Sequence, residues 1–190
     1  MKLIKSIFLA ITLLSVSNLT LADKFIIDTE GGHAAINTKF RHLGVSWLVG
    51  EFKTLEGTFT FDPDNVEASS VVVDIDTTSL DSNHERRDAK LSEAEYLNVA
   101  EFPTAKFVST SVVDKGEGNM TVNGDFTFRG MTKPLAMEVK PVGIGETRFN
   151  DFRAGFEGTA VIDTQEYGME TFGPDHKVYL DLYVEGIRKE

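Results

Sequence analysis

The segment His84-Glu85-Arg86-Arg87-Asp88 begins like the zinc-binding helix of a metalloprotease. That helix needs two histidines four residues apart on one face, with a glutamate beside them as general base. Position 88 carries Asp where the second histidine is required, and the other three histidines stand at no metal-like spacing from His84. The chain also lacks cysteine, which removes thiolate ligands and thiol catalysis. The sequence therefore predicts no metal site.

The segment Asp74-Ile75-Asp76-Thr77-Thr78 matches the D-x-D-x-T pattern of aspartate-dependent phosphoryl transfer. That chemistry requires the motif at the end of a parallel strand in an α/β sheet. Here the alternation of residue types places both carboxylates on the outward face of an antiparallel strand, which favours a solvated surface. No G-x-S-x-G elbow, Gly-rich phosphate loop or plausible Ser/His/Asp set occurs. We therefore expect no catalytic residues and no enzymatic activity.

Two arginines and an aspartate stand together at positions 86–88. Beside the mouth of a cavity, they could orient a polar head group through charge-assisted hydrogen bonds. Arg87 and Asp88 are the candidate contacts. The alternative is pairing along a helix surface with Glu93 or Glu95.

Only residues 83–97 have the composition of a helix. They contain good helix formers without Gly or Pro, and Asp81, Ser82 or Asn83 could cap the start. Pro103 then forces extended backbone on the residue before it. The apolar residues of this segment do not share one face, so we expect the helix to cover or plug the fold.

The rest of the chain alternates with a period of two, as strands do. Residues 68–78 show this most clearly, with Val71, Val73 and Ile75 on one side and Val72 and Asp74 on the other. About eight such segments at hairpin-like spacing, each with one apolar face, predict an all-β antiparallel sandwich or barrel.

The inward faces mix large aromatic residues with four small ones. The small residues are Gly124, Ala154, Gly158 and Ala160. An eight-stranded barrel either just fills its interior or holds one small ligand. The small residues therefore either leave a cavity or merely complement large neighbours.

The first 22 residues have the pattern of a signal peptide. Lys2 and Lys5 are followed by the apolar run 7–16 and by a small-residue cleavage site after Ala22. The apolar run is too short for a transmembrane helix. We therefore expect export to the periplasm and one mature domain, residues 23–190. The net charge of −11 argues against nucleic acid or anionic lipid as a partner.

Several ordered motifs along the mature chain are similar to those of a known family. They are Phe40–Ser46 followed by Gly50-Glu51-Phe52, then Thr78–Asp81, Arg87–Leu91, Glu101–Phe107 and Gly124–Pro134. On these motifs the chain resembles the YceI-like family of small bacterial periplasmic proteins that bind polyisoprenoid or other long-chain lipids. In the segment 163–169, Thr164 or Gln165 stands where that family often has an arginine.

The resemblance implies an eight-stranded antiparallel, lipocalin-like barrel with one inserted helix at about 83–97. It also implies an elongated apolar tunnel that holds an isoprenoid lipid, such as a ubiquinone-type tail, or a fatty amide, with no other cofactor required. The expected tunnel residues are Phe40, Phe52, Val73, Ile75, Phe107, Val122, Phe126, Phe128, Phe156 and Leu180. The head group is expected near Arg87 and Asp88.

A periplasmic carrier or reservoir for such a lipid is the favoured function. One alternative is an enzyme that acts on the bound lipid or on its quinone head. Another is a structural or stress-response protein that binds a membrane redox protein through its outer face. An exposed terminal strand could also pair with a second copy to form a homodimer.

Overall fold

The structure is a computed structural model that describes residues 22–170 and 175–189. The expected signal peptide, residues 1–22, lies outside the described residues except for Ala22. No helix in the described ranges combines the length and apolar character needed to cross a membrane.

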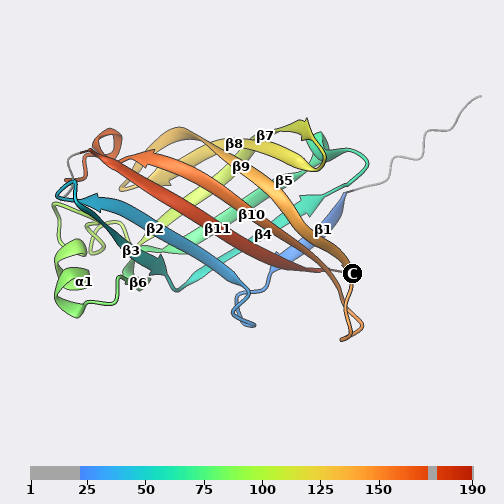
Figure 1. The fold of residues 1–190 in the computed structure, drawn as a ribbon, viewed down its shortest axis with the longest axis horizontal. Helices are drawn as coiled ribbons and strands as arrows, with labels where there is room; N and C mark the ends of the chain where they lie inside the picture. Colours follow the sequence, from blue (N-terminus) through green and yellow to red (C-terminus); the bar gives the residue numbers. More distant parts are fainter. Residues whose placement is uncertain (1–21, 171–174, 190) are drawn as a thin grey trace, which may run out of the picture.

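Within these two ranges the fold comprises eleven strand segments, one α-helix and three short 3-10 turns, arranged as Figure 1 shows. The strands are β1 (Asp23–Ile27), β2 (Ala34–His42), β3 (Ser46–Phe52), β4 (Leu55–Phe61), β5 (Ser70–Asp76), β6 (Leu80–Asp81), β7 (Thr104–Gly116), β8 (Asn119–Phe128), β9 (Met131–Glu146), β10 (Phe152–Asp163) and β11 (Lys177–Arg188). The helix is α1 (Glu85–Leu91), and the 3-10 turns are η1 (Val66–Ala68), η2 (Thr77–Ser79) and η3 (Thr164–Tyr167).

These segments form eight long antiparallel strands, three of which are interrupted. β1 and β2 both pair antiparallel with β11, so they are two halves of one strand. β3 and β4 continue each other in the same way, as do β5 and β6. β1 pairs with both β4 and β11, which closes the sheet into a barrel. The expected all-β, eight-stranded antiparallel barrel with one helix is confirmed.

The inward faces of the strands carry an apolar core with an aromatic cluster toward each end. At the end where the chain terminates, Phe25 stacks on Phe59 with ring centroids 4.8 Å apart, and Phe59 contacts Phe156 edge-on at 5.5 Å. At the other end, Phe126 and Phe128 pack against Tyr167. Because side chains alternate along a strand, each of these phenylalanine rings faces inward from a period-two segment, whereas Tyr167 reaches the core from η3.

The helix is shorter than the sequence predicts. α1 covers only Glu85–Leu91, and the residue that caps it is His84, whose Nδ1 accepts a hydrogen bond from the Arg87 N–H at 3.2 Å. The segment then turns repeatedly and buries the consecutive residues Tyr96 and Leu97. Consecutive residues of a regular helix point about 100° apart. A chain of turns, rather than more helix, therefore lets both side chains reach the core.

A bulge in β7 changes which valine is buried. The register between β7 and β8 shifts between Ser109 and Ser111. On the other side of β7, Ser109 Oγ accepts a hydrogen bond from the Val71 N–H of β5 at 2.9 Å. Val112 is consequently 5% exposed, whereas Val113 is 40% exposed.

The helix and the turns that follow it close one end of the barrel. β6 pairs only with β3, and β7 pairs with β5 and β8, so the sheet is unpaired between β6 and β7. The connecting residues 82–103 lie at this end, opposite the end that carries the C-terminus (Figure 1). Leu91 and Leu97 are buried against the core. The guanidinium of Arg129 donates to the carbonyl oxygens of Ala94 and Tyr167, which fixes this cover to the rim.

Candidate functional site

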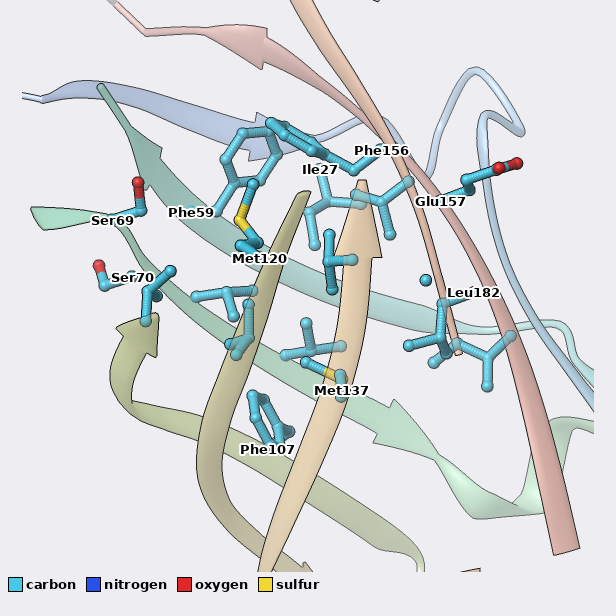
Figure 2. A pocket seen from close by; sticks show the side chains of 18 of the residues that line it. Ile27, Phe59, Ser69, Ser70, Phe107, Met120, Met137, Phe156, Glu157 and Leu182 are labelled. Atoms are coloured by element: carbon cyan, nitrogen blue, oxygen red, sulfur yellow. The ribbon is translucent and has the colours of Figure 1, made fainter. Parts of the chain in front are cut away.

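The barrel encloses an apolar space of about 140 Å³, here called the central cavity. Its wall comes from side chains of all eight long strands, and the surface that faces the space is apolar. Four polar residues also border it: Thr60, Ser69, Ser70 and Glu157. Figure 2 shows Met120, Met137 and Phe107 among the side chains around this space, while the Glu157 carboxylate points away from them. An apolar cavity of about 150 Å³ stays dry and binds benzene in another protein. The central cavity therefore has room for a hydrocarbon group of about six carbons.

A second apolar space of about 80 Å³, here called the helix-side cavity, lies against α1 and the turns after it. Leu91, Leu97 and Met169 form part of its wall. Four inward residues line both cavities: Ile36, Ile75, Phe126 and Leu180. The two spaces are therefore neighbours separated only by these side chains. A chain-like ligand that passes between them would run along the barrel interior.

All ten residues predicted to line a tunnel line one or both of these cavities. Val73, Phe107, Val122 and Phe156 line the central cavity, Phe40, Phe52 and Phe128 line the helix-side cavity, and Ile75, Phe126 and Leu180 line both. Their contact with a ligand remains a prediction.

The cavity walls also contain residues that the sequence did not single out. Met120, Leu135, Met137 and Leu182 line the central cavity. They share the apolar faces of β8, β9 and β11, so their alternation was a usable signal. Leu91, Leu97 and Met169 lie outside the strands, and no periodicity marks them. Methionine side chains are flexible and polarisable, so Met120 and Met137 can adapt their shape to a ligand.

The small inward residues serve mainly to admit large neighbours. Of the four, only Gly158 lines a cavity. A Cβ at Gly124 would lie 2.4 Å from Phe107 Cζ and 2.5 Å from the Val108 carbonyl oxygen. The space is instead bounded mainly by Val, Leu, Ile, Met and Phe side chains.

Arg87 and Asp88, the expected head-group contacts, both bind the buried Ser82. Arg87 Nε donates to Ser82 Oγ at 2.7 Å, and its Nη2 donates to the Ser82 carbonyl oxygen. Asp88 Oδ1 accepts from the Ser82 N–H at 3.0 Å and from the Ser82 hydroxyl. Neither residue lines either cavity. The geometry assigns both side chains to holding the start of α1, and their contact with a head group remains a prediction.

The D-x-D-x-T segment lies on the outer surface, as its alternation indicates. Asp74 pairs with Lys106 across β5 and β7 at 2.8 Å. Asp76 Oδ1 accepts from the Thr78 N–H at 2.8 Å and caps η2. Both carboxylates thus have structural partners.

One group of side chains within the described residues has the spacing of metal ligands: Asp28, His33 and Glu185. The guanidinium of Arg153 already lies among them, with Nη1 2.7 Å from Asp28 Oδ2, and Arg153 also binds Asp151. The hydrogen bonds from His33, the Gly31 N–H and Arg153 outweigh the opposing effect of burial and lower the pKa of Asp28. The cluster is therefore an ion-pair network with its own cation.

An eight-stranded antiparallel barrel with a small helical cover and an apolar interior belongs to the class of lipocalin-like barrels. Two solved structures share the fold. BcnA of Burkholderia cenocepacia superposes with a TM-score of 0.73 at 19% identity, over 84% of this chain and 98% of that one. A polyisoprenoid binding domain from Saccharophagus degradans superposes with a TM-score of 0.60 at 13% identity, over 90% and 100% of the two chains.

The sequence comparisons identify the family. The model of the YceI-like domain matches residues 25–185. A UPF0312 protein of Vibrio cholerae is 44% identical over 168 residues, which span 88% of this chain and 89% of that protein. The chain belongs to the YceI-like family.

Proposed function

We propose that this protein binds the apolar tail of an isoprenoid-type lipid inside its barrel and acts as a carrier or reservoir for that lipid. The observation that carries the proposal is the apolar surface that faces the central cavity, which continues past four shared side chains into the helix-side cavity. A structural relative in Saccharophagus degradans is described as a polyisoprenoid binding domain, which supports the same ligand class.

The physical scale fits a short stretch of prenyl chain. By comparison with the benzene-sized cavity, the two spaces together accommodate about two isoprene units. Each buried methylene contributes about 0.8 kcal/mol, so about ten carbons supply roughly 8 kcal/mol before the costs of association. A longer tail requires side chains such as Met120, Met137 and Phe126 to change rotamer.

The compartment is part of the proposal. The charged, apolar and small-residue pattern of residues 1–22 supports export and cleavage after Ala22. The carrier would then hold its cargo in the aqueous periplasm, where a free prenyl tail is insoluble. Quinone, polyprenyl and fatty-amide head groups are all compatible with a wall that recognises only the tail.

The experiment is native mass spectrometry of the protein purified from its native periplasm, with an organic extract analysed beside it. We expect an adduct with the mass of a prenylated lipid. Val122→Phe places a ring in the central cavity and should abolish the adduct, whereas Val108→Phe adds the same ring on the outward face of β7 and should retain it. A folded protein that carries no lipid, or a Val122→Phe variant that binds as well as wild type, would contradict the proposal.

A further inference from the structure

The turn between β2 and β3 presents four large apolar side chains to solvent. We call Leu43, Val45, Trp47 and Val49 the hairpin patch; they are 70%, 83%, 51% and 62% exposed. Trp47 and Val49 lie on the outward face of β3, whereas Val45 and Leu43 stand in the turn before it, Leu43 with a positive φ of 52°. Trp47 packs edge-on against Tyr179 of β11, with ring centroids 5.5 Å apart. Exposed apolar residues gathered in this way usually mark an interaction site.

The chain segment that carries the patch differs in charge from the chain as a whole. The chain has a net charge of −11, yet residues 31–50 contain no Asp or Glu. Arg41 lies directly across from Trp47 in the β2–β3 register, is exposed, and donates to the Gly44 carbonyl oxygen at 2.8 Å. No ion pair of Arg41 occurs within the described ranges, whereas Lys39 pairs with Asp181 at 3.1 Å.

A tryptophan and a tyrosine beside aliphatic residues and an unpaired arginine match the chemistry of a membrane interface. Aromatic rings with a polar edge concentrate at the head-group level of bilayers, and basic residues are attracted to anionic lipid. Phe149, in the turn between β9 and β10, is also exposed, and the Arg148 guanidinium lies 4.9 Å from its ring centroid. That turn carries no second large apolar side chain and also contains Asp151. It is therefore less suited to docking than the hairpin patch.

The position of the patch connects it to the interior. The inward side chains of the same two strands, Phe40 of β2 and Phe52 of β3, line the helix-side cavity. The β2–β3 turn and α1 lie at the same end of the barrel (Figure 1). A surface that contacts the patch would therefore face the end that the helix and its turns close.

We propose that the hairpin patch docks on the surface of a bilayer that contains anionic phospholipid. The carboxylates that follow on β11 and β3, Asp181 and Glu51, are each paired with a lysine, Lys39 and Lys53. Because screening limits electrostatic interactions to about 8–10 Å, the negative charge on the rest of the chain acts only weakly at the patch. This docking would use the outer face of β3 and the turn before it, and it does not depend on whether the barrel binds a lipid. A second copy of the chain is the less suitable occupant, because patch-to-patch contact would bring two Arg41 side chains together with no carboxylate from residues 31–50 between them.

Trp47 is the single tryptophan of the chain, so its fluorescence reports on the patch directly. Protein comprising residues 23–190 is titrated with vesicles of phosphatidylcholine and phosphatidylglycerol in equal parts. We expect a blue shift, weaker quenching by acrylamide, and co-sedimentation with the vesicles. Val45→Asp should lower the vesicle partition coefficient by about tenfold or more. Val142→Asp, at a valine that is also highly exposed but lies on β9, should leave it unchanged.

The proposal is overturned if wild-type protein neither shifts its emission nor sediments with these vesicles. It is also overturned if Val45→Asp and Val142→Asp weaken vesicle binding equally. A blue shift that increases with protein concentration in the absence of vesicles would instead indicate self-association and would also overturn it. The Val122→Phe variant distinguishes vesicle docking from the proposed carrier function. Its docking should equal that of wild type even where its lipid adduct is lost.

Discussion

At the scale of single residues, the barrel interior depends on where a side chain is absent. Gly124 of β8 lets the Phe107 ring lie directly over the backbone, so that Phe107 can form part of the wall of the central cavity. Gly143 of β9 has no atom within 4 Å of where a Cβ would stand. These two glycines have opposite constraints within the same sheet.

We predict that Gly124→Ala lowers the free energy of unfolding by about 1–3 kcal/mol, because the new methyl group must displace Phe107 or the backbone of β7. The matched change Gly143→Ala should be neutral or should stabilise the fold by up to about 1 kcal/mol, because alanine lowers the conformational entropy of the unfolded chain. Urea unfolding measures both. Equal effects of the two changes would contradict the close approach at Gly124.

A second residue-scale feature is the ion-pair network at the break between β1 and β2. Asp28 binds His33 Nδ1 at 2.8 Å and Arg153 Nη1 at 2.7 Å, and Arg153 also binds Glu185 and Asp151. The network therefore joins the β1–β2 connection to β10 and β11 at the point where one long strand is interrupted.

The lowered pKa of Asp28 gives stability a defined pH dependence. Because the pKa is lower in the folded state, Asp28 stabilises the fold above its unfolded pKa of about 3.9. That contribution is lost as the pH falls from about 4 through the folded pKa. Asp28→Asn should cost about 1 kcal/mol at neutral pH, a modest value because the network is partly solvated. Urea midpoints measured down to about pH 2 should converge for the two proteins; a constant difference would contradict the assignment.

At the scale of elements, α1 is a helix that tertiary contacts maintain. Seven residues are too few for an isolated helix to be stable in water. Its start is held by Arg87, Asp88 and Ser82, and its end by burial of Leu91. The turns that follow are anchored by Leu97 and by the Arg129 hydrogen bonds.

We predict that Leu91→Ala lowers the free energy of unfolding by about 2–4 kcal/mol and enlarges the helix-side cavity. The loss should concentrate in the cover, so amide hydrogen exchange should accelerate across residues 85–103 more than in the strands. Arg86→Ala, on the exposed side of α1, should change stability by less than about 0.5 kcal/mol. Uniform acceleration over the whole barrel would show that the cover does not open separately.

At the scale of the whole molecule, the first strand completes a ring with the last. β1 pairs with β4 and with the C-terminal half of β11, and the buried Phe25 stacks on Phe59 at that seam. The Phe25–Arg188 register joins residues near opposite ends of the described chain. The barrel closes only when these segments, which are far apart in the sequence, have paired.

A chain that begins at Asp28 therefore lacks the closing strand. We predict that it loses the cooperative thermal transition of the chain that begins at Asp23, and that the exposed edges of β4 and β11 promote association. Circular dichroism melting and size-exclusion chromatography test this expectation. A monomer with an unchanged melting temperature would show that β1 is dispensable for closure.

The sequence by itself determined the class of fold and the inward faces. Alternation at Phe126 and Phe128, or at Val73 and Ile75, places those side chains on one side of a strand whatever the neighbouring strand is. All ten predicted tunnel residues consequently line the cavities. The motifs that carry the family resemblance lie in β2, β3, β6, α1 and β7 and in the β8–β9 hairpin.

Only the tertiary structure decided how the interior is divided and closed. Residue spacing carries no information on the distance between facing strands, so the roles of Gly124 and Gly158 were open until their neighbours were placed. The segment predicted as helix over 83–97 has helix-forming composition, but burial of Tyr96 and Leu97 in the core ends the helix at Leu91. Arg87 and Asp88 look like free polar groups in the sequence, whereas the fold brings both onto Ser82. Local pattern determines which way a side chain faces, and long-range packing determines what it meets there.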